Sequence, residues 1–377
     1  MKTPLCEMLG IEFPLFAFTH CRDVAAAVSR AGGFGVFGGA MIGADQLKIE
    51  LDWIDAHVDG KPYGVDLAIP ENMPTKAERD QNSATMYARI PEQHKKFVDD
   101  LLIKHGINPK SPVPFDEPHQ LSPFLDEAER MVIESLRHPI KLLVNALGRP
   151  PQFLIDRSHA AGVAVGALVG SKEHALKQLA MGVDVLIAQG TEAAAHCGEV
   201  STMVLTPEIV RAVEQVRPGT PVLSAGGIVT GRQMAAAMAM GAAGAWTGSV
   251  WLTTTESSVA PVVKEKLLAA SSSDTLRSRA MTGKTARQLR TAWSDAWEGP
   301  GSPGPLPMPF QHLLTDRAFQ LATKSYETGN AAARAVVSEG VGQGVGMITA
   351  EKSCRTVVQE FMEDFADALE RVRALED

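Results

Sequence analysis

The sequence lacks several features that would place it in other protein classes. Its 377 residues include only four cysteines, and these show neither a close pair nor metal-ligand spacing: Cys6, Cys21, Cys197 and Cys354. This usage predicts buried or free thiols in a reducing cytoplasm, not a disulfide framework or a zinc site. Aromatic residues make up only 6% of the chain. The N-terminus has no apolar centre of the kind that signal peptides carry.

Long apolar runs and basic clusters are also missing. The longest apolar candidate, 235–246, falls well short of the ~20 residues that cross a bilayer, so we expect no contact with a membrane. Lys and Arg number 36 against 44 Asp and Glu, which gives a net charge of −8. A mildly acidic chain without a dense Lys/Arg run is a poor candidate for nucleic-acid binding. A hydrophobic share of 45% and 33 glycines instead fit an α/β enzyme with tight turns.

Short apolar segments alternate with amphipathic segments along most of the chain. Eight apolar segments are each followed by helical sequence, and they are centred near residues 14, 35, 65, 143, 166, 186, 223 and 245. Eight such βα units over ~250 residues predict a TIM barrel, the (β/α)8 fold. A doubly wound open sheet is the alternative and needs fewer strands. One expected helix covers 207–216, with Pro207 in its first turn.

Two regions depart from this alternation. Residues 70–120 are polar and rich in Pro and Lys, apart from a helix expected at 91–102. We interpret them as an insertion after the third strand that lies over one end of the sheet. A barrel domain is expected at 1–252, and 253–377 should hold the last barrel helix and a helical C-terminal extension. This extension ends in an amphipathic segment, 357–375, whose periodicity allows packing on the barrel or a homodimer contact.

Glycines follow the last two strands of the expected barrel. Ser224-Ala225-Gly226-Gly227-Ile228 ends the seventh strand, and Trp246-Thr247-Gly248-Ser249 ends the eighth. In TIM barrels these two loops commonly form a phosphate site, because glycines let backbone N–H groups approach the phosphate oxygens. A short helix starting at Ser249 would add its positive end. The alternative is that Gly226-Gly227 is only a tight turn.

A histidine-containing segment follows the sixth strand. Gln189 and Gly190 stand at the carboxyl end of the strand, where barrels bind ligands, and His196 follows in a loop that would cover the site. An imidazole exchanges protons near neutral pH, so His196 is the candidate catalytic residue; a hydrogen-bonded loop histidine is the alternative. Cys197 is not expected to act with it as a nucleophile, because adjacent residues rarely converge on one point. Glu192 is expected to cap or orient the loop.

Taken in order, these motifs resemble those of the nitronate monooxygenase family of flavoproteins. The resemblance covers roughly residues 10–300 and rests on five segments: Gln189-Gly-x-Glu-Ala-x-x-His196, Ser224-Ala-Gly-Gly-Ile-x-x-Gly231, Met240-Gly-Ala-x-Gly-Ala-Trp-Thr-Gly-Ser249, Asp274-Thr275 with Thr282-Gly-Lys-x-x-Arg287, and Ala27-Val-Ser-x-Ala-Gly-Gly-Phe-Gly35. It implies an FMN-containing TIM barrel that oxidises an alkyl nitronate, with O2 reacting at the reduced flavin.

The resemblance also implies roles for particular residues. The FMN phosphate would lie on Gly226, Gly227, Gly248 and Ser249, and Gln189 and Gly190 would contact the flavin ring or the ribityl chain. Ala17, Asp66, Ala225 and Thr247 complete the expected cofactor-binding set. His196 would bind or deprotonate the substrate beside the flavin.

The chain departs from the family pattern near this site. The first strand ends in Phe16-Ala-Phe-Thr-His20 where the family has Pro-Met-Ala-Gly, and the third strand offers Asp66 where the family has Asn. An Asp beside anionic reduced flavin is unfavourable unless it is paired or protonated. Ala194-Ala195 replaces the usual Gly-Gly before the histidine. His20 is either a second polar group facing the flavin or a solvent-facing turn residue.

Three other functions fit parts of the pattern. The same barrel with FMN would serve an NAD(P)H-dependent reductase of quinones or enoyl thioesters, which steady-state oxidation of NADH would reveal. A flavin-free phosphosugar isomerase or lyase normally needs a Lys or a carboxylate pair at the strand ends, and we find none in the sequence. A binding protein would keep FMN or phosphate without chemistry. Under the nitronate interpretation, the partners are a small-molecule substrate and O2.

Overall fold

The structure, a computed structural model, describes residues 1, 3–40, 42–71, 83–113 and 125–375. Eight parallel strands close into a barrel, so the predicted TIM-barrel fold is confirmed. In their order around the barrel the strands are β1 (Leu15–Thr19), β2 (Phe34–Gly38), β3 (Tyr63–Leu67), β4 (Leu142–Asn145), β5 (Ala164–Val169), β6 (Val185–Gln189), β8 (Val222–Ala225) and β9 (Gly244–Thr247).

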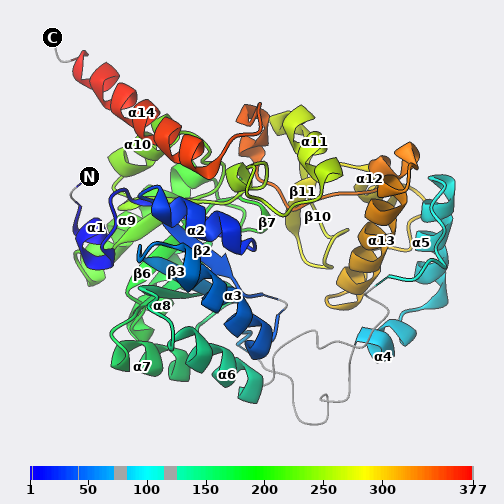
Figure 1. Cartoon of the computed structure of the whole chain (residues 1–377), viewed down its shortest axis with the longest axis horizontal. Helices are drawn as coiled ribbons and strands as arrows, with labels where there is room; N and C mark the ends of the chain where they lie inside the picture. Colours follow the sequence, from blue (N-terminus) through cyan, green and yellow to red (C-terminus); the bar gives the residue numbers. More distant parts are fainter. Residues whose placement is uncertain (2, 41, 72–82, 114–124, 376–377) are drawn as a thin grey trace.

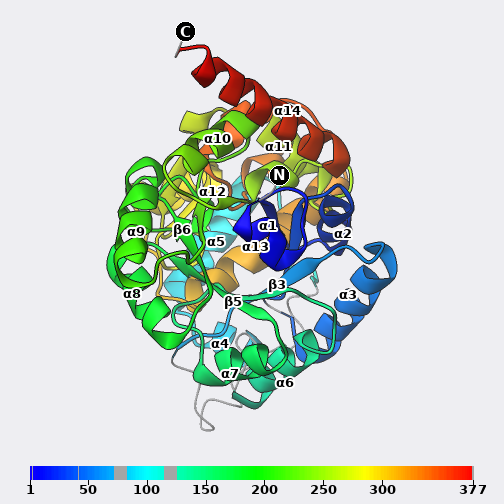
Figure 2. The same ribbon diagram turned by 90° about the vertical axis from the view of Figure 1, so that its left-hand side faces the viewer.

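A ring of helices covers the outside of the barrel (Figure 2). It comprises α2 (Arg22–Arg30), α3 (Ala44–His57), α6 (Leu125–Ser135), α7 (Gln152–Ala160), α8 (Lys172–Met181), α9 (Thr202–Val216), α10 (Gly231–Ala239) and α14 (Cys354–Arg373). A short helix, α1 (Pro4–Leu9), covers the amino end, where Leu5 and Leu9 pack with the inward side chains of the strands. None of these helices covers the carboxyl end of the barrel, beside which a second core lies.

Side chains alternate between the inside and the outside of the barrel, as they must on a pleated strand. Phe16, Val36 and Val144 belong to the inner cluster. Val65 and Leu67 belong instead to the outer layer beneath the helices. Asp66 lies between these two residues on β3, so its side chain points into the barrel near the carboxyl end.

Helix α14 supplies the eighth member of the outer ring. It packs against α10 and α2, and the approach to α10 is close because position 231 is a glycine. A Cβ at Gly231 would lie 1.8 Å from the carbonyl oxygen of Phe361. Phe361 and Phe365 are buried there, whereas Val372 is exposed in the last turn, which extends past the barrel (Figure 1). The amphipathic C-terminal segment therefore packs on the barrel.

A second hydrophobic core lies beside the carboxyl end of the barrel, at the right of Figure 1. Trp293, Trp297 and Leu314 are buried within it. Its helices are α4 (Ser83–Ala88), α5 (Glu92–Lys104), α11 (Pro261–Ala269), α12 (Ala292–Glu298) and α13 (Phe310–Glu327). The helix expected at 91–102 is therefore confirmed as α5. The rest of the expected 70–120 insertion lies partly outside the described residues, at 72–82 and 114–120.

A small antiparallel sheet joins the two cores. Its strands are β10 (Thr275–Ser278), β11 (Ala286–Leu289) and β7 (Ala195–His196), in the order β10-β11-β7. In Figure 1 they lie between the barrel and helices α12 and α13. The expectation that 253–377 is helical is wrong here, because four-residue strands containing Arg and Gln give no apolar signal. Single-turn 3-10 helices complete this region: η3 (Ser249–Trp251), η4 (Ser272–Asp274), η5 (Ala331–Ala335) and η6 (Gln343–Met347).

Helix α9 begins earlier than the sequence predicts. It starts at Thr202, so Pro207 lies inside the helix and not in its first turn. A proline there removes one internal N–H donor, and the packing of Leu205 and Ile209 in the core compensates for this loss. Among the described helices, none is both long enough and apolar enough to cross a membrane.

Candidate functional site

The two glycine loops lie side by side at the carboxyl end of the barrel. They follow neighbouring strands, β8 and β9, in which Ala225 pairs with Trp246 near the carboxyl ends. Gly226 and Gly227 have φ values of 119° and 71°, a region in which L side chains are strained. A Cβ at Gly248 would meet nothing within 4 Å, so there is open space beside this backbone. The predicted adjacency of the loops is therefore present, with room for a ligand.

Ser249 opens a three-residue 3-10 helix, η3, and not the longer helix that the sequence suggested. A single turn has too few aligned peptides to supply a helix dipole of consequence. The Ser249 hydroxyl accepts a hydrogen bond from the Gly342 backbone N–H at 2.9 Å. Because a hydroxyl both accepts and donates, its proton is still available to an anion in the open space.

Glu192 holds the loop after β6 against the start of α9. Its carboxylate accepts hydrogen bonds from the Thr202 backbone N–H at 2.9 Å and from the Thr202 hydroxyl at 2.7 Å. The contact caps α9, which explains why this helix begins before Pro207. It also agrees with the expectation that Glu192 orients the loop. Gly190 is required at this crossing, because a Cβ there would lie 2.2 Å from the Thr202 hydroxyl oxygen.

His196 lies at the seam between the barrel and the second core. It sits in β7 opposite Ala286 of β11, and its Nε2 lies 2.8 Å from the Thr282 hydroxyl. That hydroxyl contacts the Lys284 carbonyl oxygen at 3.1 Å, where the hydroxyl must be the donor. Thr282 then accepts from Nε2–H, and Nδ1 is the unprotonated nitrogen.

The surroundings of His196 favour its neutral form. Burial lowers the pKa of the imidazole below its ordinary value, and the charges of Lys284 and His312 lower it further. A neutral imidazole with a free Nδ1 can accept a proton near neutral pH. The residue before it, Ala195, has a φ of 54°, in the left-handed region where the family pattern has glycine.

Cys197 is a half-buried thiol in the loop beside His196. Burial raises the pKa of this thiol, and its Sγ lies 3.4 Å from the Thr191 carbonyl oxygen. Within the described ranges, His, Cys, Asp and Glu nowhere gather in a group of three that could hold a metal ion.

The inner wall of the barrel mouth includes Asp66. Its side chain is 3% exposed, and its Oδ1 has no hydrogen-bond partner. Burial raises the pKa of this carboxyl to about 8, although the Ala146 backbone N–H lowers it in part. Gln189, the last residue of β6, is half-buried at the same end of the barrel.

Two residues of the expected cofactor-binding set face away from the mouth. Ala17 packs in the outer layer, against Val24 and Val28 of α2. Thr247 is also turned outward, since the preceding Trp246 belongs to the inner cluster. Its hydroxyl donates to the Phe16 carbonyl oxygen at 2.7 Å and accepts from the Trp251 indole N–H at 2.9 Å. Only the backbone of these two residues can border a ligand, and the alternation of the strands could have predicted this.

His20 lies over the end of β2. Its Nδ1 is 2.9 Å from the Gly38 carbonyl oxygen, and its ring stands edge-on to Phe18. A Cβ at Gly38 would lie only 2.8 Å from Nδ1, so the glycine makes room for the ring. Gly38 pairs with Asp66 across the sheet, which places His20 and Asp66 on either side of this glycine.

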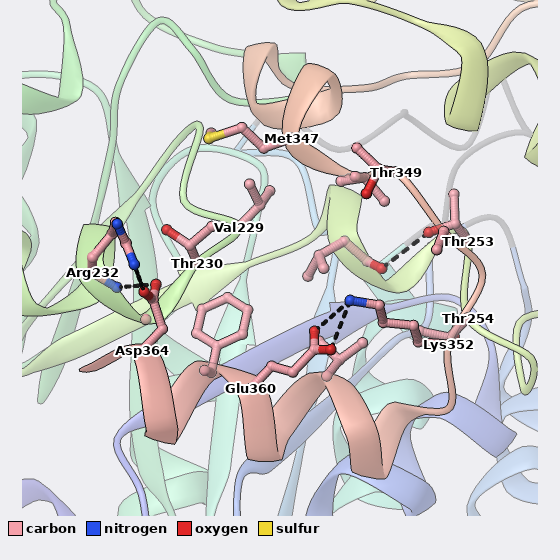
Figure 3. A pocket seen from close by; sticks show the side chains of 16 residues that line it. Val229, Thr230, Arg232, Thr253, Thr254, Met347, Thr349, Lys352, Glu360 and Asp364 are labelled. Atoms are coloured by element: carbon pink, nitrogen blue, oxygen red, sulfur yellow. Dashed lines mark hydrogen bonds and ion pairs between the residues drawn. The ribbon is translucent and has the colours of Figure 1, made fainter. Parts of the chain in front are cut away.

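A separate cavity of about 340 Å³ lies outside the strand barrel, between α10, α14 and residues 347–352 (Figure 3). Arg232 pairs with Asp364, and Lys352 pairs with Glu360 at 2.7 Å. The charged groups of this cavity therefore fasten α14 in place, and we assign them no part in binding at the barrel mouth.

The fold and the mouth define a class: an α/β-barrel enzyme with neighbouring glycine loops and a half-buried neutral histidine at the carboxyl end of its strands. The nitronate monooxygenase family profile matches residues 2–364. The chain therefore belongs to the nitronate monooxygenase family, a family of flavin-dependent oxidoreductases, as its motifs suggested.

Individual relatives match most or all of the chain. It is 46% identical to Rv1533 of Mycobacterium tuberculosis (strain ATCC 25618 / H37Rv), a protein provisionally named a monooxygenase; the match covers 100% of this chain and 99% of the relative. It is 30% identical to an octahydro-1H-indene-4-carboxyl-CoA dehydrogenase of the same organism, over 77% of this chain and 67% of that protein.

Solved structures agree on the fold. FabK from Thermotoga maritima matches with a TM-score of 0.72 and 25% identity, over 100% of this chain and 99% of the other. Nitroalkane oxidase from Streptomyces ansochromogenes matches with a TM-score of 0.75 and 24% identity, over 98% of this chain and 100% of the other.

Proposed function

We propose that this protein is an FMN-dependent nitronate monooxygenase that oxidises an alkyl nitronate with O2. The observation that carries the proposal is the position of His196, a half-buried neutral imidazole with an unprotonated Nδ1, at the same end of the barrel as the paired glycine loops. Membership in the family supports the reaction class.

The residues present fit a flavin mononucleotide. Open space beside Gly248 and the left-handed backbone of Gly226 and Gly227 leave a cradle for a phosphate. The unpartnered Asp66 Oδ1 on the inner wall offers a polar contact to a ring placed over the barrel. When bound, FMN supplies the redox chemistry of the reaction with nitronate and O2.

The contribution of the protein is placement and proton handling. Backbone N–H groups of the two loops and the Ser249 hydroxyl would bind the phosphate. His196 Nδ1 would take a proton from the carbon next to a nitro group, or hold a nitronate that is already ionised. The hydrogen bond from Nε2 to Thr282 fixes the orientation of the imidazole during this step.

A purified sample tests the proposal. We expect a yellow protein that releases FMN, and not FAD, on denaturation. Substitution His196→Asn should lower nitronate-dependent O2 consumption by ~10²-fold while the flavin stays bound, the scale of a lost general base. His57→Asn, at an exposed position on α3, is the matched control and should leave turnover unchanged. A colourless protein that FMN does not reconstitute contradicts the cofactor; unchanged turnover of the His196 variant removes this residue from the mechanism.

A second candidate is an NAD(P)H-dependent flavin reductase acting on a quinone or an enoyl thioester. The similarity to FabK and to the octahydro-1H-indene-4-carboxyl-CoA dehydrogenase favours it. Rapid NADH oxidation by the purified holoprotein, together with inactivity towards a panel of nitronates, would select this function over the first.

A further inference from the structure

Asp66 occupies a position on the inner wall where a carboxyl group has no evident structural role. Its neighbours in the sheet are Gly38 on β2 and Val144 on β4. The cluster of side chains inside the barrel is apolar and includes Phe18, Val36 and Leu168. Burying a carboxyl group among such side chains costs free energy unless the group forms a hydrogen bond with a polar ligand.

No charged group of the described chain compensates this carboxyl. Strands β2 and β4, which pack on both sides of β3, contain no ionisable side chain. Helix α2 also contacts β3, but from outside the barrel, where Arg22 pairs with Glu50. The Ala146 backbone N–H lies near the carboxyl, and His20, a titratable group at the mouth, is bonded to the Gly38 carbonyl oxygen.

These surroundings determine the protonation state of Asp66. Ionising a buried carboxyl without a cation is costly, and burial raises its pKa to about 8. At neutral pH the group is therefore mostly a carboxylic acid, with one O–H donor. Oδ1 finds no partner in the described chain, although buried polar atoms are almost always hydrogen-bonded. A group bound at the mouth can supply this partner.

We propose that Asp66, in its neutral carboxylic acid form, donates a hydrogen bond to an acceptor atom of the bound flavin ring. This inference deepens the proposed function and rests on flavin binding at this mouth. It assigns Asp66 a defined role on the side of the ring that faces the barrel interior, separate from that of His196. Above the pKa of the group, the proton passes to solvent. The donor is then replaced by a negative charge, which disfavours electron-rich reduced flavin.

The first test needs no flavin. Infrared spectra of the flavin-free protein at pH 6.5 should contain the C=O band of a protonated carboxyl that disappears in Asp66→Asn and is titrated away at alkaline pH. The difference between wild type and variant isolates Asp66 from Glu339, a second carboxyl whose pKa burial raises. Asp184→Asn is the matched control, because Asp184 is partly exposed and accepts from His159 and from the Val165 N–H; the band should be unchanged.

The second test uses the holoprotein. The midpoint potential of the bound flavin should fall more steeply with pH in wild type than in Asp66→Asn, which keeps a donor N–H but cannot ionise. Asp66→Leu, which has no donor, should weaken FMN binding about tenfold, the scale of one lost buried hydrogen bond.

The outcomes separate the two proposals. Suppose that the holoprotein binds flavin. If the flavin-free protein then lacks the Asp66 carboxyl band at pH 6.5, or if wild type and Asp66→Asn have the same slope of midpoint potential against pH, the role of Asp66 alone is overturned. A wild-type protein that binds no flavin overturns the proposed function and this contact with it.

Discussion

The left-handed backbone of Ala195 makes a quantitative prediction about the segment that positions His196. Among the described residues, only Asp59 and Ala195 have a positive φ without being glycine, and Ala195 has φ 54°. For an L residue this conformation costs roughly 1–2 kcal/mol, a cost that glycine does not incur. Glycine loses more freedom on folding, which subtracts roughly 0.4–1 kcal/mol. The substitution Ala195→Gly should therefore stabilise the protein by about 0.5–1 kcal/mol.

Urea unfolding of the flavin-free protein, followed by circular dichroism, measures this difference. The control is Ala194→Gly, one residue earlier, where φ is not positive. There only the entropic cost applies, so the control should lose roughly 0.4–1 kcal/mol. Opposite signs for two neighbouring Ala→Gly changes are the signature of a strained backbone. If both variants lose stability equally, Ala195 is not strained and the reasoning fails.

Three further predictions concern the mouth. Gly227→Glu should abolish FMN binding, because a carboxylate would occupy the place of the phosphate; normal flavin content in the purified variant would show that the loop is misassigned. Glu192→Ala should cost about 1 kcal/mol in urea unfolding, through the lost cap on Thr202, and no loss would mean that the cap is dispensable. Between pH about 4 and about 8 folded Asp66 keeps a proton that the unfolded chain has released, so this residue should lower stability as pH rises, by about 1.4 kcal/mol per unit. Asp66→Asn should remove this part of the pH dependence of unfolding, and identical profiles for the two proteins would contradict the shifted pKa.

The features that depend on local pattern could be predicted from the sequence. Strand and helix alternation gave the barrel, because each βα unit buries its own apolar face. The glycines after β8 and β9 could be located because neighbouring parallel strands end at the same edge. Helix α8 carries local signals at both ends, since Ser171 caps its start and the left-handed Gly182 follows its last residue.

The features that depend on distant segments could not be predicted. The pairing of His196 with Ala286 joins residues 90 positions apart, and two-residue strands have no period to detect. The start of α9 at Thr202 is decided by the Glu192 carboxylate, which lies ten residues earlier.

The eighth outer helix, α14, comes from the end of the chain, and this has a consequence for biosynthesis. Residues between β9 and α14 form much of the second core, so the ribosome must add about a hundred residues before the ring can close. Until then the flank of α10 that receives Phe361 and Phe365 is open to water in the nascent polypeptide. Chaperones that recognise apolar patches would find one on the growing chain during this interval, and it disappears once α14 docks.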